Sequence, residues 1–73
     1  MTDDQFTRLD SLMQELVGRE GARHNEETIT RLFNLNNEIT GILEYSKSCG
    51  SCRSRVYNRM KEIWYGAGGV KKH

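Results

Sequence analysis

The chain has 73 residues, 36% of them hydrophobic, no proline, and a formal net charge of +1. This length allows one domain with a small core, so we expect a single domain over residues 1–73 that gains stability from a partner or from self-association. No apolar run approaches the roughly 18 residues of a membrane span, and the acidic first five residues lack the apolar core of a secretory signal. We therefore expect no membrane insertion and no secretion through a signal peptide.

The first predicted helix spans residues 3–17, where apolar side chains recur at helical spacing. Thr2 or Asp3 is expected to cap its start, because a short polar side chain can accept a hydrogen bond from the first turn. Gly18 is expected to end it.

The second predicted helix spans residues 26–45 and follows a linker, residues 18–25, that holds two glycines and no apolar period. Asn25 is expected to cap this helix, and Gly41 would lie inside it, as a sign of close approach between helices. Asn36 lies within the apolar stripe, where it either pairs with a second copy of itself and sets the register, or bonds to water or backbone at the margin. The apolar face is predicted to consist of Ile29, Leu32, Phe33, Leu35, Ile39, Ile42 and Leu43.

The third predicted helix spans residues 50–65, with Ser48 or Ser51 as its cap. Its inward stripe is predicted to contain Cys52, Val56, Met60 and Ile63. Residues 66–73 form a glycine-rich basic tail with only Val70 to bury, so we expect the tail to be flexible. The sequence thus predicts an all-α helical hairpin or three-helix module with a flexible C-terminal tail.

Charge is distributed unevenly along the chain. Residues 1–45 carry nine acidic and four basic side chains, a net charge of −5, whereas residues 46–73 carry seven basic side chains and one acidic one, a net charge of +6. A basic end of this kind favours contact with an acidic protein surface or with phosphate groups. Protein and nucleic acid are therefore the two partner classes to consider.

The Cys49–Cys52 pair, a CxxC motif at the predicted start of the third helix, has three interpretations. Two thiolates at this spacing are half of a zinc site, which His24 and His73 together, or the CxxC of a second subunit, would have to complete. A helix N-terminus also lowers a thiol pKa, as in redox pairs, although redox motifs of the thioredoxin type follow a strand. The third interpretation is that both side chains simply pack where the turn meets the core.

The sequence contains no motif for phosphate binding, dinucleotide binding or metalloprotease chemistry, so we expect no enzymatic activity. A structural or adaptor protein fits the small core and the charged end better, and large aromatic side chains are favoured interface anchors. For Trp64 the alternative is core packing at the helix end. The residues expected to contact a partner are Arg53, Arg55, Arg59, Lys61, Trp64 and Tyr65.

Nucleic-acid binding is the main alternative. The second and third helices are compatible with a helix-turn-helix, in which Arg53, Arg55 and Arg59 would face a duplex. The acidic N-terminal half would repel DNA, and the predicted connection is longer than the usual turn of this motif. A small zinc-stabilised dimer is a further alternative.

Residues 45–61 follow the pattern Tyr-x-Lys-x-Cys-x-x-Cys-Arg-x-Arg-Val-Tyr-x-Arg-Leu/Met-Lys, which covers about a quarter of the chain. In this pattern they resemble a segment found in short proteins of tailed bacteriophages, including crAss-like phages of gut bacteria. The resemblance implies a small virion component, such as a capsid accessory protein or head-fibre adaptor, located in the virion or the host cytoplasm. It implies no catalytic residues.

Overall fold

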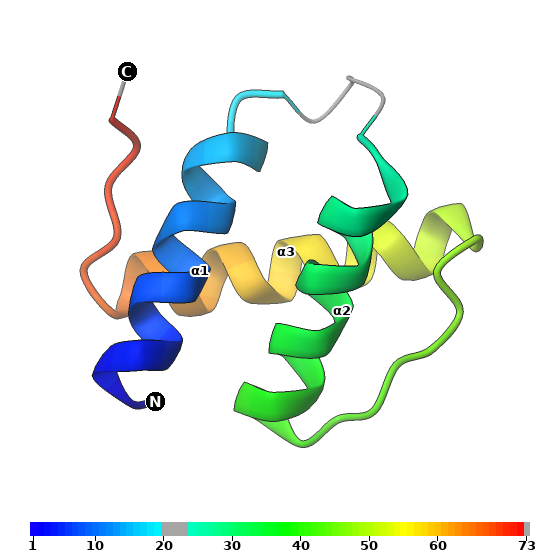
Figure 1. The fold of residues 1–73 in the computed structure, drawn as a ribbon, viewed down its shortest axis with the longest axis horizontal. Coiled ribbons are helices and arrows are strands. Elements are labelled where there is room, and N and C mark those ends of the chain that lie inside the picture. Colours follow the sequence, from blue (N-terminus) through cyan, green and yellow to red (C-terminus); the bar gives the residue numbers. More distant parts are fainter. Residues whose placement is uncertain (20–23, 73) are drawn as a thin grey trace.

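The computed structural model describes residues 1–19 and 24–72, and these residues form helices and no strand. The helices are α1 (Asp3–Leu16), α2 (Glu26–Thr40) and α3 (Gly50–Gly66). α1 and α2 lie side by side, and α3 runs across both of them (Figure 1). The prediction of a small all-α fold is confirmed. Residues 20–23 of the predicted linker, and His73, lie outside the described residues.

The first two helices begin at the residues that the sequence indicates. The Thr2 hydroxyl accepts a hydrogen bond from the Gln5 backbone N–H at 3.1 Å, and the Gln5 side chain accepts one from the Thr2 N–H at 2.9 Å. This reciprocal pair satisfies two backbone donors that the helix leaves free. In α2 the Asn25 side chain accepts from the Thr28 N–H at 2.7 Å.

The end of α2 differs from the prediction, because Gly41 ends the helix and does not lie within it. Gly41 adopts a left-handed conformation with φ of +72°, and its N–H donates to the Asn37 carbonyl oxygen. A residue without a Cβ adopts this conformation at little cost, which explains why the helix ends here. Ile42 and Leu43, predicted to belong to the apolar face, are therefore outside the helix and are 53% and 61% exposed.

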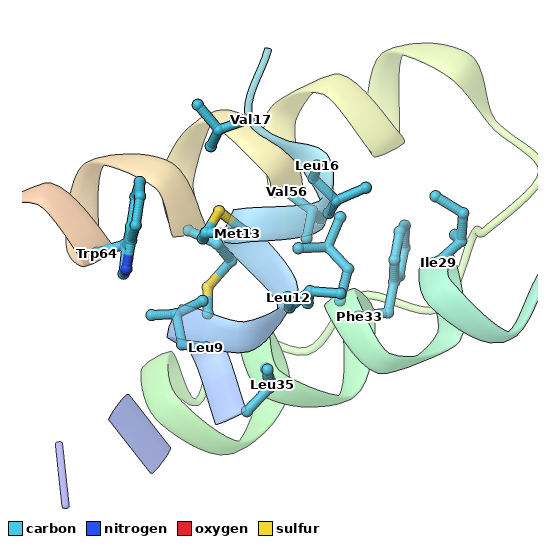
Figure 2. Close-up of a cluster of buried hydrophobic side chains, with 12 residues drawn as sticks. Leu9, Leu12, Met13, Leu16, Val17, Ile29, Phe33, Leu35, Val56 and Trp64 are labelled. Atoms are coloured by element: carbon cyan, nitrogen blue, oxygen red, sulfur yellow. The ribbon is translucent and has the colours of Figure 1, made fainter. Parts of the chain in front are cut away.

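Buried side chains from all three helices form one core cluster: Leu9, Leu12, Met13, Leu16, Val17, Ile29, Leu32, Phe33, Leu35, Val56, Met60 and Trp64. Trp64 lies at one end of the cluster and Ile29 at the other (Figure 2). The Trp64 side chain is fully buried, and its Nε1–H donates to an Asp10 carboxylate oxygen at 3.0 Å. Trp64 is thus a core residue, and its prediction as a partner-binding anchor is wrong.

The residues after α3 pack back onto α1 and run alongside it (Figure 1). The Gln14 side chain donates to the Val70 carbonyl oxygen at 2.7 Å and accepts from the Lys72 N–H at 2.7 Å. Gly69 is buried against Trp64, whereas Val70 is 66% exposed. The flexibility of the tail stays a prediction.

None of the helices among residues 1–19 and 24–72 is long and apolar enough to cross a membrane. The longest, α3, has 17 residues and carries several charged side chains.

Replacing Gly69 with alanine tests the contact between the tail and the core. The added Cβ would overlap the indole ring of Trp64, which is buried and has no room to move. Overpacking of this kind lowers the free energy of unfolding by about 1–3 kcal/mol, measured by urea denaturation. The matched control is Gly66→Ala, where an added Cβ meets nothing within 4 Å, so no loss is expected. Equal stability of the two variants would contradict the packing of Gly69 on Trp64.

Candidate functional site

Two of the predicted partner-binding arginines form ion pairs within the chain. The Arg55 guanidinium donates to both carboxylate oxygens of Glu44, at 3.1 and 3.2 Å, and an Arg59 nitrogen lies 3.5 Å from the same carboxylate. The hydrogen bond from Arg55 is the main cause that lowers the pKa of Glu44, with the charge of Arg59 adding to the effect. Because Glu44 offsets part of the positive charge, α3 is less electropositive than its sequence suggests.

Arg59 also holds a buried amide in place. The Asn36 side chain is fully buried, its oxygen accepts from Arg59 at 2.8 Å, and its nitrogen donates to the Ile42 carbonyl oxygen at 2.8 Å. A buried polar group left without partners would cost free energy, and here both ends of the amide are satisfied inside the chain. Asn36 is therefore not free to pair with a second copy, so that interpretation is wrong.

The chain between α2 and α3, residues 41–49, is held against the helices and is called the connecting segment from here on. The Asn37 side chain accepts from the Glu44 N–H at 2.8 Å and donates to the Glu44 carbonyl oxygen at 3.2 Å. Despite this fixed backbone, Ile42, Leu43 and Tyr45 are 53%, 61% and 71% exposed. These three side chains are called the apolar patch.

Sequence reasoning missed the apolar patch because it continued α2 through Gly41. The signal was present, since glycine is the residue that most often ends a helix in the left-handed conformation. What obscured it was the apolar spacing, which runs through Ile42 and Leu43 as if the helix went on. Periodicity alone does not distinguish a continued helix from an exposed apolar segment.

The other predicted partner-binding residues do not gather at one place. Arg53 is exposed, and its Nε–H donates to the Lys47 carbonyl oxygen. The Lys61 ammonium lies 5.0 Å from the centre of the Tyr57 ring. Tyr65 is 50% exposed but lies near the other end of α3, about 18 Å along the helix axis from Arg53 at 1.5 Å per residue. The six residues therefore do not form a single surface.

The two cysteines lie at the start of α3, where Cys49 itself caps the helix in place of the predicted Ser48 or Ser51. The Cys49 sulfur accepts from the Cys52 backbone N–H at 3.3 Å and lies 3.3 Å from the Ser51 hydroxyl. Both cysteines are free thiols of intermediate exposure. Cys52 was expected to face the core, but it is not buried as Val56, one turn further on, is.

The two thiols differ in acidity. A hydrogen bond from the Cys52 thiol is the largest cause that lowers the pKa of Cys49 to about 7, followed by hydrogen bonds from the Ser51 hydroxyl and the Cys52 N–H. The same thiol–thiol interaction raises the pKa of Cys52, with burial and the charge of Cys49 adding to it, while Arg55 opposes the shift. Cys49 is therefore the more readily ionised thiol.

Among residues 1–19 and 24–72, no three His, Cys, Asp or Glu side chains are grouped so that they could hold a metal ion. A ring nitrogen of His24, one of the predicted additional ligands, bonds to the Arg19 carbonyl oxygen at 3.0 Å. Within one chain, Cys49 and Cys52 thus supply two of the four ligands that a structural zinc ion requires. Zinc binding stays a prediction, and a site with four protein ligands would need a second subunit.

Comparison with protein-family models, with curated proteins and with solved structures gives no match for this chain. Its function is therefore argued from the residues and their geometry.

Arg59→Ala tests whether this arginine belongs to the fold. Its removal leaves the oxygen of the buried Asn36 amide without its donor, which should lower the free energy of unfolding by about 1–3 kcal/mol. Urea denaturation measures the change. Arg53→Ala is the matched control, because this side chain is exposed and bonds to a carbonyl oxygen of the connecting segment, so its removal should cost much less. Equal losses would mean that Arg59 does not support Asn36.

The lowered pKa of Glu44 predicts a dependence of stability on pH. A carboxyl group whose pKa is lower in the folded state stabilises the fold above its unfolded pKa of about 4.3, and this contribution is lost as the pH falls through the folded value. Between about pH 5 and 3, the melting temperature of Glu44→Gln should therefore fall less than that of the wild type. The pKa of Glu38 is also lowered, mainly by a hydrogen bond from Arg8. Because Glu38 is present in both proteins, its contribution to the pH dependence cancels when the two are compared.

The control for this pH series is Glu62→Gln. Glu62 is exposed on α3 and forms no ion pair with any residue in the described part of the chain. This variant should keep the wild-type dependence on pH. Parallel curves for Glu44→Gln and the wild type would show that the ion pair with Arg55 does not stabilise the fold.

Proposed function

We propose that this chain is a non-enzymatic structural or adaptor protein that docks onto a larger protein through the connecting segment. One observation carries the proposal: Ile42, Leu43 and Tyr45 are exposed on a backbone that Asn36 and Asn37 hold by hydrogen bonds. An apolar patch on a fixed backbone is typical of a surface that another protein covers.

The energetics favour such an interface. Burying a large apolar side chain contributes about 1.5–3 kcal/mol, so three of them offer several kcal/mol to a partner. Because the backbone is already ordered, binding does not have to fix it, and less free energy is lost on association. Tyr45 is 71% exposed and has the rigid aromatic ring that interface anchors commonly use.

The residues beside the patch indicate the chemistry of the partner. Lys47 is part of the connecting segment, Arg53 bonds to its carbonyl oxygen, and Arg55 remains 53% exposed although it pairs with Glu44. A complementary surface would combine an apolar hollow with an acidic rim, because opposite charges around an interface guide encounter and select the partner. The proposed partner is therefore a protein with an acidic surface around an apolar pocket.

The resemblance of residues 45–61 to short phage proteins supports a particular setting for this interaction. It places Tyr45, Lys47, Arg53 and Arg55 within the shared pattern. The proposed role is a small component of a bacteriophage particle, a capsid accessory protein or head-fibre adaptor, present in the virion and, before assembly, in the host cytoplasm.

DNA binding is the second candidate, favoured by the exposure of Arg53, Ser54 and Asn58 on the outward side of α3. Two features weigh against it. The connecting segment is longer than the three or four residues of a helix-turn-helix turn, and Arg55 and Arg59 are paired with Glu44. Fewer free cations remain to contact phosphates.

Incorporation into phage particles tests the proposal. A tagged copy of the chain is supplied in the host during infection by a phage that encodes it, and quantitative mass spectrometry measures how much purified particles contain. The wild-type chain should be incorporated. The double variant Leu43→Ser, Tyr45→Ser should be incorporated at least tenfold less, because a loss of about 1.4 kcal/mol of binding free energy weakens binding tenfold.

The matched control is Val70→Ser, which removes an apolar side chain that is 66% exposed outside the patch and should be incorporated normally. Circular dichroism establishes that all variants remain helical. Equal incorporation of the double variant would contradict docking through the patch, and absence of the wild-type chain from particles would contradict the virion role.

A salt-dependent shift of duplex DNA, lost in Arg53→Ala, would favour the DNA-binding alternative. If the wild-type chain forms a dimer and the double variant is a monomer, a second copy of the chain is the partner that covers the patch.

A further inference from the structure

The first turn of α3 brings together two thiols that the proposed docking role does not use. Cys49 and Cys52 are three positions apart; Cys49 caps the helix, and its sulfur lies 3.3 Å from the Cys52 backbone nitrogen. Two thiols held together at the start of a helix have the arrangement of Cys-x-x-Cys redox motifs, in which a disulfide can join the two sulfurs. Both side chains are partly exposed, so a small molecule can reach them.

We propose that Cys49 and Cys52 form a redox-active dithiol that exchanges with small-molecule disulfides, with Cys49 as the attacking thiolate and Cys52 as the resolving thiol. The proposal concerns the chemistry of this chain alone and does not depend on the partner of the apolar patch.

The position of Cys49 favours its thiolate form. Its sulfur caps the N-terminus of α3 and accepts the Cys52 backbone N–H at 3.3 Å, with the Ser51 hydroxyl at the same distance. Backbone donors at a helix N-terminus carry a partial positive charge that stabilises an anion. The first turn of α3 contains no acidic residue to oppose this effect.

The positions of the two thiols match these roles. The Cys49 sulfur lies at the N-terminus of α3 and accepts a backbone hydrogen bond, whereas Cys52 lies within the first turn of the helix.

The exchange is balanced in atoms and electrons. The Cys49 thiolate attacks one sulfur of a disulfide RSSR, forms a Cys49–S–S–R mixed disulfide and releases RS⁻. Cys52 then loses its proton to solvent, and its thiolate attacks the Cys49 sulfur, which forms the Cys49–Cys52 disulfide and releases a second RS⁻. Two electrons pass from the dithiol to RSSR, which leaves as two thiols.

The other interpretations of the CxxC motif account for less of this geometry. Core packing predicts buried side chains, but both cysteines are partly exposed, while Val56 and Met60 on the same helix are fully buried. A zinc site needs ligands beyond these two cysteines, and the described residues of one chain do not supply them.

Oxidised glutathione is the probe for the test, applied to the full-length reduced protein in metal-free buffer at pH 7. Intact mass spectrometry after acid quenching should show a monomer lighter by two hydrogen atoms. Cys52→Ser should stop at the mixed disulfide and gain one glutathionyl group. Cys49→Ser should react about tenfold more slowly, because its remaining thiol lacks the position at the N-terminus of α3 that favours a thiolate. Serine is itself a good helix cap, so this variant retains the start of α3.

A second measurement isolates the attacking thiol. The rate at which iodoacetamide alkylates Cys49 in the Cys52→Ser variant should rise with pH. This substitution removes the Cys52 thiol, which is the largest cause that lowers the pKa of Cys49. The midpoint of the rate against pH should therefore lie between about 7 and the 9.0 of an ordinary thiol. Equal rates for the two single variants would overturn the proposal. So would a wild-type product carrying two glutathionyl groups, a disulfide-linked dimer, or stoichiometric zinc that stays bound and blocks the reaction.

Discussion

The side-chain amide of Asn36 is buried where α2, α3 and the connecting segment meet, and it has no access to water. Its oxygen accepts from Arg59 and its nitrogen donates to the Ile42 carbonyl oxygen, so one side chain joins three parts of the chain. A buried amide must be satisfied in full, because each unpaired group costs more than a hydrogen bond contributes. The bond from Asn36 to Ile42 holds the connecting segment against the helices. Asn36 and Glu44 together hold Arg59, and Glu44 also pairs with Arg55.

The same network reduces the positive charge that α3 presents to a partner. Arg55 and Arg59 share the carboxylate of Glu44, so part of the positive charge counted in the sequence is offset before any partner arrives. Fixing Glu44 also fixes its neighbours Leu43 and Tyr45, whose side chains are left exposed. Charge remains at the edge of this surface, but apolar side chains form its centre.

The two ends of α3 differ in exposure: the C-terminal end contributes to the core, and the N-terminal end is partly exposed. At its C-terminal end, Trp64 is buried, bonded to Asp10 and covered by Gly69, so this end is part of the core. At its N-terminal end lie the thiols of Cys49 and Cys52 and the connecting segment, all at least partly open to solvent. The residues of both proposals therefore lie at the end of the helix that the core does not use.

The sequence by itself determined the helical class and the starts of α1 and α2, because Thr2 and Asn25 cap their helices through bonds to residues three positions away. It also indicated the CxxC motif as a candidate site, with zinc binding, redox chemistry and core packing as its interpretations. Gly41 is a local signal for the end of α2, although the apolar spacing beyond it indicated a longer helix. Tertiary structure alone decided that Trp64 is buried and that Arg55 and Arg59 are paired with Glu44. Each of these depends on groups distant in sequence, Trp64 on Asp10 and Arg59 on Asn36, whose approach follows from packing three helices around one core and leaves no trace in local spacing.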